Sequence, residues 1–350
     1  MRHFSLKGNE NNEEMKKLAP VIDIKNITKE FKVLNRREGL AGSIKDLFSR
    51  DYKIVKAVDN ITMSIGQGEI VGYLGPNGAG KSTTIKMMTG VLEPTSGEIL
   101  VNGKLPYRNR SKNAQNIGVV FGQRSQLWWA LPLVESFKLL KDIYQISDEQ
   151  YDGMMKLYQS LVDIEPLLHK PVRQMSLGQR TLSDILAAFL HDPKIVFLDE
   201  PTIGLDVSMK AKIRTLIHAL NKEKNTTVIL TTHDMGDVDA LCRRIVIIDK
   251  GRMLYDNDIS HLKGFFGSYR TLKIRVDGDL SKESAVIAKE FPEFKVSADD
   301  EWISLLVDEE KSTIMDVFTG LQKKRRISDM QLEEISTEDV IRKIYEEGVK

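Results

Sequence analysis

One short stretch of the sequence has the residue types and spacing needed to hold a chain of phosphates. Residues 75 to 82, GPNGAGKS, match G-x-x-x-x-G-K-[ST]; a predicted strand, EIVGYL, precedes them and a predicted helix follows. Glycines let successive backbone N–H groups turn toward an anion, and a helix N-terminus adds its positive dipole end. A glycine-rich turn that matches by chance would not need these flanks. The stretch therefore predicts a P-loop, with Lys81 on the β/γ-phosphates and the Ser82 hydroxyl on Mg²⁺.

A pair of acids closes another strongly apolar run. Residues 195 to 200, IVFLDE, predict a buried strand that ends at Asp199 and Glu200. Asp199 would hold Mg²⁺ directly or through water, and Glu200 would polarise an attacking water. Alone, such a pair is more simply a solvated strand end. Together with a P-loop, it indicates hydrolysis of a nucleoside triphosphate.

Further motifs occur in the order typical of one family of P-loop ATPases. Residues 175 to 179, MSLGQ, come shortly before the acid pair and resemble the L-S-G-G-Q signature of ABC-type ATPases. Three more positions resemble the Q-loop glutamine, the D-loop and the switch histidine of that family: Gln123, the segment from Pro201 to Asp206, and His233. The resemblance covers about residues 21 to 262 and is nearest to the ATPase subunits of ABC-2-type exporters, whose permease is a separate chain.

The resemblance implies a set of ATP ligands. The phosphates would be held by Gly75, Pro76, Asn77, Gly78, Ala79, Gly80, Lys81, Ser82 and Thr83. Tyr52 is similar to the aromatic residue that stacks on adenine, and Phe31, on the other side of an insertion, is the rival candidate. The signature residues would contact the γ-phosphate of an ATP held by a second subunit, and the D-loop adds one more ATP-binding residue: Ser176, Gly178, Gln179 and Asp206.

The resemblance also implies the catalytic roles. Glu200 would be the general base, His233 would hold the γ-phosphate, and Gln123 would contact the water and report the nucleotide state to the permease. The Mg²⁺ ligands would be Ser82, Gln123 and Asp199. Because the signature serves the opposite site, two ATPase subunits must face head to tail, either as a homodimer or with a close paralogue. Catalysis would rest on positioning and charge stabilisation.

Two departures from the family pattern leave the rate of hydrolysis open, but not the identity of the site. Leu177 replaces the first glycine of the signature, and a side chain there narrows the backbone options if φ must be positive. Leu182 stands where such signatures often carry an arginine. Arg180 either substitutes for that arginine or the contact is missing.

The pattern of elements divides the chain. Residues 1 to 19 predict a polar tail, and residues 20 to 266 an α/β nucleotide-binding domain with a helical subdomain at about 124 to 180. Residues 267 to 350 predict βαββαβ and a final helix, the order of an α+β ferredoxin-like unit. By resemblance, this C-terminal domain is a regulatory or dimer-supporting appendage.

Composition excludes several classes of protein. Among 350 residues, Lys+Arg 51 against Asp+Glu 50 gives a formal charge of +1, which leaves no electrostatic footprint for nucleic acid. The single cysteine, Cys242, excludes a disulfide framework. No apolar run is long enough to cross a bilayer, and the N-terminus does not resemble a secretory signal. We expect a peripheral protein on the cytoplasmic side of the cell membrane.

Two segments raise the question of a partner. Trp128 and Trp129 follow Gln123 closely, in the region that resembles the surface on which the permease docks. Either they contact the permease, or one or both fill the core of the helical subdomain. Residues 32 to 51 form an insertion whose GSIKDLFSR stretch is amphipathic. It contacts the permease or the lipid surface, or it packs on its own domain.

Two rival functions differ from export. A non-transport ABC ATPase that remodels ribosomes or DNA would usually carry two cassettes or long coiled coils, whereas this sequence has one P-loop, one signature and no heptad tract. An importer ATPase has the same chemistry, but the tail and Q-loop region resemble exporters. The sequence does not name the cargo, which the permease selects.

Overall fold

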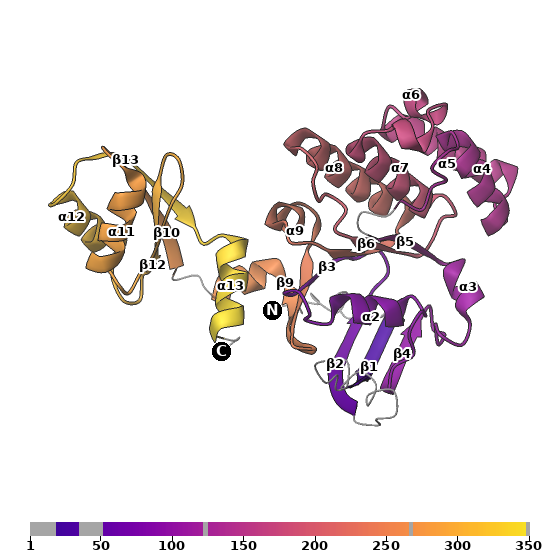
Figure 1. The fold of residues 1–350 in the computed structure, drawn as a ribbon, viewed down its shortest axis with the longest axis horizontal. Helices are drawn as coiled ribbons and strands as arrows, with labels where there is room; N and C mark the ends of the chain where they lie inside the picture. The colour runs from indigo at the N-terminus through magenta and orange to yellow at the C-terminus, as the bar shows by residue number, and fades with distance from the viewer. Residues whose placement is uncertain (1–18, 35–51, 122–124, 266–268, 348–350) are drawn as a thin grey trace, which may run out of the picture. The chain divides into compact units, whose positions relative to one another are not determined.

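The protein is described by a computed structural model that covers residues 19–34, 52–121, 125–265 and 269–347 (Figure 1). It divides into two compact units, Met1–Asp256 and Asn257–Lys350, and each is described by itself. The predicted polar tail up to residue 18, most of the insertion at 32–51, and Gln123 lie outside the described residues. In the described part, no helix is long and apolar enough to cross a membrane.

The first unit is built on a mainly parallel sheet with the order β5-β6-β7-β3-β8-β9. Its strands are β3 (Ile70–Leu74), β5 (Ile117–Phe121), β6 (Ile195–Asp199), β7 (Thr227–Thr231), β8 (Arg244–Asp249) and β9 (Arg252–Asp258). The central strands β3 and β7 are buried along their whole length, as expected for parallel strands covered on both faces.

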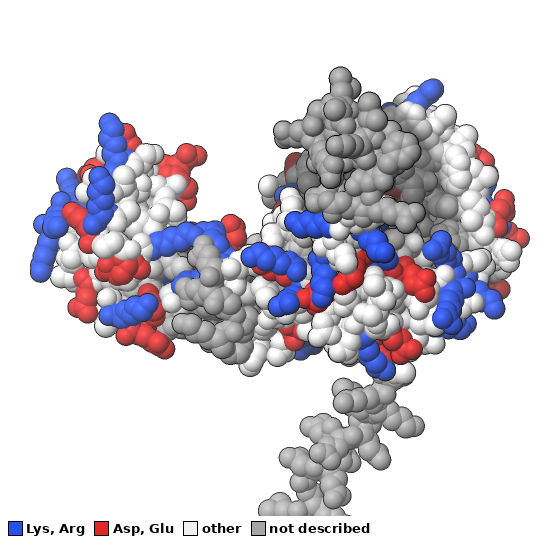
Figure 2. All heavy atoms as spheres, turned by 60° about the horizontal axis from the view of Figure 1, so that its bottom comes forward, with Lys and Arg blue, Asp and Glu red and all other residues white. Residues whose placement is uncertain are grey.

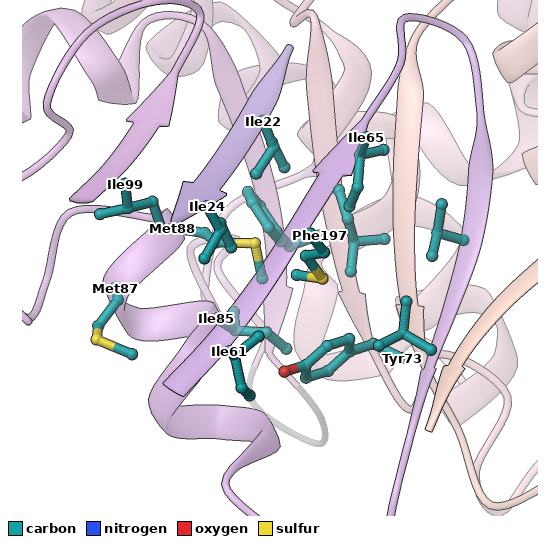
Figure 3. Close-up of a cluster of buried hydrophobic side chains, with 14 of the residues drawn as sticks. Ile22, Ile24, Ile61, Ile65, Tyr73, Ile85, Met87, Met88, Ile99 and Phe197 are labelled. Atoms are coloured by element: carbon teal, nitrogen blue, oxygen red, sulfur yellow. The ribbon is translucent and has the colours of Figure 1, made fainter. Parts of the chain in front are cut away.

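The first unit also contains an antiparallel sheet with the order β2-β1-β4. Its strands are β1 (Ile22–Leu34), β2 (Tyr52–Ile65) and β4 (Ser96–Val101). Helix α2 (Lys81–Met88) lies between the two sheets. Figure 3 shows the buried side chains that meet there: Ile24 and Ile61 from the antiparallel sheet, Ile85 from α2, and Tyr73 and Phe197 from the parallel sheet. This core fixes the start of α2, where the P-loop ends.

Helices cover the rest of the parallel sheet. They are α3 (Arg110–Ala114), α7 (Leu177–Phe189), α8 (Val207–Lys224) and α9 (Met235–Leu241). Between β5 and α7 the chain forms the predicted helical subdomain with α4 (Leu133–Tyr144), α5 (Asp148–Leu161), α6 (Glu165–Leu168) and a short 3-10 turn, Val172–Gln174. Helix α7 contacts α4 of this subdomain and β5 of the sheet, so it joins the two.

The second unit has the predicted βαββαβ order followed by a helix: β10 (Tyr269–Val276), α11 (Leu280–Glu290), β11 (Lys295–Ala298), β12 (Ile303–Asp308), α12 (Ile314–Gln322), β13 (Ile327–Glu334) and α13 (Thr337–Glu347). Its strands pair antiparallel in the order β11-β12-β10-β13, so the ferredoxin-like prediction is confirmed. The unit begins before the predicted boundary at residue 266, because α10 (Ile259–Phe265) contacts α13.

Candidate active site

The P-loop joins β3 to α2 and needs glycine at defined positions. Gly78 and Gly80 have φ of 82° and 106°, in the left-handed region that side chains rarely adopt. A Cβ at Gly80 would lie 2.4 Å from the Ala57 carbonyl oxygen, and one at Gly75 would lie 2.5 Å from that of Ile248. Neighbouring backbone therefore approaches the loop so closely that only glycine fits.

Lys81 is the first residue of α2, and its side chain turns back over the loop. Its Nζ donates to the Gly75 carbonyl, and to the Pro76 carbonyl at 3.1 Å. Burial lowers the pKa of Lys81, and the charges of Glu200 and Asp199 oppose that shift. The geometry thus holds an ammonium group inside the cradle, next to the acids that end β6.

The acid pair lies beside the P-loop, as the motifs predict. Asp199 ends β6 and accepts a hydrogen bond from the Thr231 hydroxyl of β7. The next residue, Glu200, has φ of 52°, an uncommon conformation for a residue with a side chain. Its N–H donates to the Thr231 carbonyl at 2.9 Å, which fixes the turn. His233, two residues after Thr231, places Nε2 3.1 Å from Glu200 Oε1.

These elements enclose a pocket of about 360 Å³. Its lining residues are Ala57, Pro76, Asn77, Gly78, Gly80, Lys81, Ser82, Thr83, Asp199 and Glu200. The structure therefore brings most of the predicted phosphate ligands and both acids to one place. Ala57 also lines the pocket, and the sequence does not predict this. It belongs to no motif, and only the position of β2 in the fold brings it to the pocket.

The predicted adenine-stacking residue lies far along the same strand. Tyr52 precedes Ala57 by five positions in β2, or about 16 Å of extended chain, and it is not among the pocket's lining residues. The rival, Phe31, pairs across the hairpin with Val55, which is two positions from Ala57. Both aromatic side chains are exposed. The register therefore brings Phe31 closer to the pocket than Tyr52.

The signature segment begins α7 and lies outside this pocket. Ser176 caps the helix: its Oγ accepts the Gln179 N–H at 3.3 Å, and its own N–H donates to Gln179 Oε1 at 3.1 Å. Lys170 Nζ also donates to Gln179 Oε1, at 3.0 Å. Leu177 is the first helical residue and its φ is not positive, so the departure from glycine strains no backbone here.

Gly178, the next residue of the signature, packs closely against α8. A Cβ at Gly178 would lie 2.6 Å from Met209 Cγ of α8, so the signature and the start of α8 pack closely. Asp206 caps α8, accepting the Met209 N–H at 2.9 Å. Leu182 is buried in α7, and the Arg180 guanidinium lies over the Trp129 ring, 5.2 Å from its centroid.

A buried carboxylate, Asp237 of α9, ties together the segments that flank the acids. It accepts hydrogen bonds from the Thr202 hydroxyl at 2.5 Å, the Thr232 hydroxyl at 3.0 Å and Arg214 Nε at 2.7 Å. Arg214 belongs to α8, which starts at the D-loop, and Thr232 precedes His233. No motif points to Asp237, because two of its three partners, Thr202 and Arg214, are distant in sequence.

The glycine cradle, the lysine and the strand-end acids define a P-loop nucleoside triphosphatase. The antiparallel sheet against α2, and the helical subdomain that ends in a capped S-L-G-Q helix, define the ABC type within that class. A family model described as "ABC transporter" matches residues 58–203. A second model, "AAA domain, putative AbiEii toxin, Type IV TA system", matches residues 170–239.

Curated relatives agree with the family model. ABC transporter ATP-binding protein NatA of Bacillus subtilis is 32% identical over 215 residues, 61% of this chain and 87% of the relative. Bacitracin transport ATP-binding protein BcrA of Bacillus licheniformis is 33% identical over 213 residues, 61% of this chain and 68% of the relative. The chain belongs to the family of ABC transporter ATP-binding proteins.

Other matches mark the shared cassette. ABC transporter A family member 1 of Dictyostelium discoideum is 34% identical over 252 residues, 71% of this chain, but the match spans only 28% of that relative. Among solved structures, the dimeric post-hydrolysis state of the ATP-binding cassette MJ0796, bound to ADP and Pi, matches with TM-score 0.54 and 26% identity. That match covers 68% of this chain and 98% of the cassette.

Proposed function

We propose that this chain binds and hydrolyses ATP to power an ABC-2-type exporter through separate transmembrane permease subunits. The observation that carries the proposal is that Lys81 and Glu200 line one pocket, that His233 lies 3.1 Å from Glu200, and that the signature lies outside this pocket. The names of the relatives NatA and BcrA, both ATP-binding proteins of transporters, support it.

The chemistry follows from the geometry of the pocket. Glu200, held by the backbone of Thr231, accepts the proton of the attacking water, and His233, 3.1 Å from Glu200, holds the γ-phosphate. Lys81 and the loop's N–H groups hold the phosphate charge. Ser82 and Asp199 line the same pocket and offer oxygen ligands of the kind Mg²⁺ prefers. Bound Mg²⁺ would neutralise charge on the β- and γ-phosphates, and Gln123 is a further ligand by resemblance.

A second ATPase subunit completes each site in this proposal. Ser176, Gly178 and Gln179 do not line their own chain's pocket, so their predicted ligand is an ATP held by the opposite subunit. The dimeric state of the MJ0796 cassette supports such an arrangement. The second subunit is an identical copy or a close paralogue.

For adenine, the register of the hairpin favours Phe31 over Tyr52. We expect Phe31→Ala to weaken ATP binding by about tenfold, since base stacking on an aromatic side chain contributes about 1 to 3 kcal/mol. Tyr52→Ala is the matched control on the facing strand, and ATP affinity measured by calorimetry should hardly change. A larger loss of ATP affinity in Tyr52→Ala than in Phe31→Ala would instead assign adenine stacking to Tyr52.

The permease contact is proposed at the tryptophan pair. Trp128 is 38% exposed and Trp129 is 55% exposed, which favours an interface over a purely structural role in the core. The insertion at residues 32–51 is a second candidate contact. Basic and acidic side chains are interspersed on the face in Figure 2, and Lys+Arg 51 nearly balance Asp+Glu 50 in the whole chain, which favours a protein partner over nucleic acid. The chain would then be peripheral on the cytoplasmic side of the membrane.

The test is to purify the tagged chain in mild detergent from its native membranes and identify its partners by mass spectrometry. Recovery of a multispanning protein whose presence stimulates the ATPase supports the proposal. Recovery with ribosomes, or without any partner, would favour the alternative of an ABC ATPase outside transport. Uptake rather than efflux by the reconstituted complex would favour the importer alternative.

A further inference from the structure

The loop that carries the two tryptophans is attached to the helix that carries the signature. Ser125 Oγ and the Gln126 N–H both donate to Asp184 Oδ1 of α7, at 3.0 Å and 3.1 Å. Gln126 Nε2 donates to the Asp184 carbonyl oxygen at 3.1 Å. One residue of α7 thus receives three hydrogen bonds from two consecutive loop residues.

The same loop is held at a second place. The Arg180 guanidinium, one turn before Asp184 on α7, lies over the Trp129 ring at 5.2 Å. The Trp129 carbonyl accepts the Arg173 N–H at 3.0 Å, and the Leu131 carbonyl accepts the Val172 N–H at 3.1 Å. Residues 125–131 are therefore fixed along their length to the segment from Val172 to Asp184.

Asp184 is an unusual residue for its position on the helix. It is 6% exposed, and its neighbours on α7 include the apolar Ile185 and Leu186, both fully buried. Burial raises the pKa of Asp184 to about 6, while the hydrogen bonds from Ser125 and Gln126 lower it. A buried carboxyl group costs folding free energy unless hydrogen bonds satisfy it, and here the loop supplies them.

Asp184 lies between the tryptophan loop and the signature segment at the start of α7. Toward the loop it anchors residues that directly precede Trp128 and Trp129. Along α7 it lies eight residues, or about 12 Å, from Ser176, where the helix begins. A rigid helix carries a displacement from one end to the other.

We propose that Asp184 is a positioning residue that makes the loop 125–131 and helix α7 one mechanical unit, so that displacement of the tryptophan surface moves the signature segment Ser176–Gln179, and the reverse. Asp184 does this without contacting nucleotide. The identity of the permease as the partner at the tryptophans rests on the proposed function. The attachment of the loop to the helix does not.

Tryptophan fluorescence tests the attachment without a permease. The chain has three Trp, so Trp302→Phe leaves Trp128 and Trp129 as the only emitters. In this background with Glu200→Gln, ATP binding should change the emission, because engagement of the signature moves the loop. Asp184→Ala should remove most of that change, because the loop would no longer move with the helix.

Two variants separate positioning from a loss of structure. Asp184→Asn keeps an oxygen that accepts from Ser125 and Gln126, so it should restore the response. Ser183 is the buried neighbour of Asp184, and its hydroxyl donates to the Gln179 carbonyl oxygen and to Met175 Sδ rather than to the loop. Ser183→Ala should therefore leave the response intact. Ser125→Ala removes the loop side of the bond without altering the helix, and should reduce the response partially.

A normal response in Asp184→Ala and Ser125→Ala would overturn the proposal, as would an equal loss in Ser183→Ala. In the complex with its permease, the ratio of stimulated to basal ATPase should fall toward one in Asp184→Ala and recover in Asp184→Asn. If the unaltered chain shows no stimulation while the fluorescence results hold, the transport function fails and the positioning role of Asp184 stands.

Discussion

At the scale of single residues, catalysis depends on where Glu200 is held. Its left-handed backbone and its bond to Thr231 point the carboxylate toward His233 and the P-loop. Glu200→Gln keeps the size and hydrogen bonds of the side chain but removes the base. We expect ATP to bind normally and to stabilise the dimer, while turnover falls by at least about a hundredfold, the usual contribution of a general base.

Steady-state ATPase and size-exclusion chromatography with ATP check this prediction together. Thr231→Val is a useful companion because it removes the hydroxyl that donates to Asp199 while leaving Glu200 in place. We expect a smaller loss of turnover in that variant. Turnover of Glu200→Gln close to that of the unaltered protein would contradict the assignment of Glu200 as the base.

Asp184 gives the stability of the protein a predictable dependence on pH. Its folded pKa of about 6 lies above the ordinary value of 3.8, so its contribution to stability is fully present below about pH 4 and is lost as pH rises through 6. Asp184→Asn resembles the neutral form at every pH. At pH 8 the free energy of unfolding of Asp184→Asn should therefore be about 1 to 3 kcal/mol higher than that of the unaltered protein. The difference should vanish near pH 4.

Urea titrations at several pH values measure this difference. Asp308, a buried acid of the second unit, is the matched control with the opposite sign. Burial would raise its pKa, but hydrogen bonds from the Glu310 backbone, Tyr269 and Lys311 lower it. Asp308→Asn should be less stable at pH 8 and converge with the unaltered protein as pH falls. The same trend in both variants would refute the explanation.

At the scale of elements, the strand ends and helix starts that form the site are held by Asp237. It joins the segment after Glu200, the switch segment before His233, and α8. Asp237→Ala removes the buried partner of Arg214, which then keeps only its 3.3 Å pair with the partly exposed Asp234, and should cost about 2 to 4 kcal/mol of stability. We also expect ATPase to fall more than ATP affinity, because the catalytic pair shifts while the P-loop does not.

Chemical denaturation and parallel ATPase and ATP-binding assays separate the two effects. Lys138→Ala breaks a pair with Glu135 in which both side chains are about half exposed, so it should change stability by less than about 0.5 kcal/mol. An Asp237→Ala protein with unaltered turnover would show that the network does not position the catalytic residues.

The elements also show which parts of the site the sequence predicts and which it does not. The P-loop, the acid pair and the signature are contiguous, and the periodicity of their flanks gives the strand or helix that presents them. Sequence reasoning did not find Ala57, Asp184 and Asp237, because each meets residues that are far away in the sequence. The order of Tyr52 and Phe31 relative to the pocket depended on strand register, which spacing alone does not reveal.

At the scale of the whole molecule, the chain separates its chemistry from its second unit. The pocket, the signature and the switch segment all belong to the first unit, whereas the second has its own core of strands and helices. Removal of residues 259–350, which leaves β9 whole, should therefore leave ATP affinity unchanged within about twofold, since no pocket residue is lost. Calorimetry on the shortened chain measures this. A loss of ATP binding by a folded shortened chain would mean that the second unit supports the site.

The long hairpin of the first unit has a consequence for protein engineering. Strands β1 and β2 stay paired until Leu34 faces Tyr52, so the chain leaves and re-enters the sheet at neighbouring points. Inserting residues between two paired strand ends costs little, because each doubling of a loop costs only about 0.6 kcal/mol of closure free energy. For work on the ATPase without its permease, the point where Leu34 faces Tyr52 is therefore a natural place to graft an affinity tag or a fluorescent reporter without shifting the register that leads to Ala57.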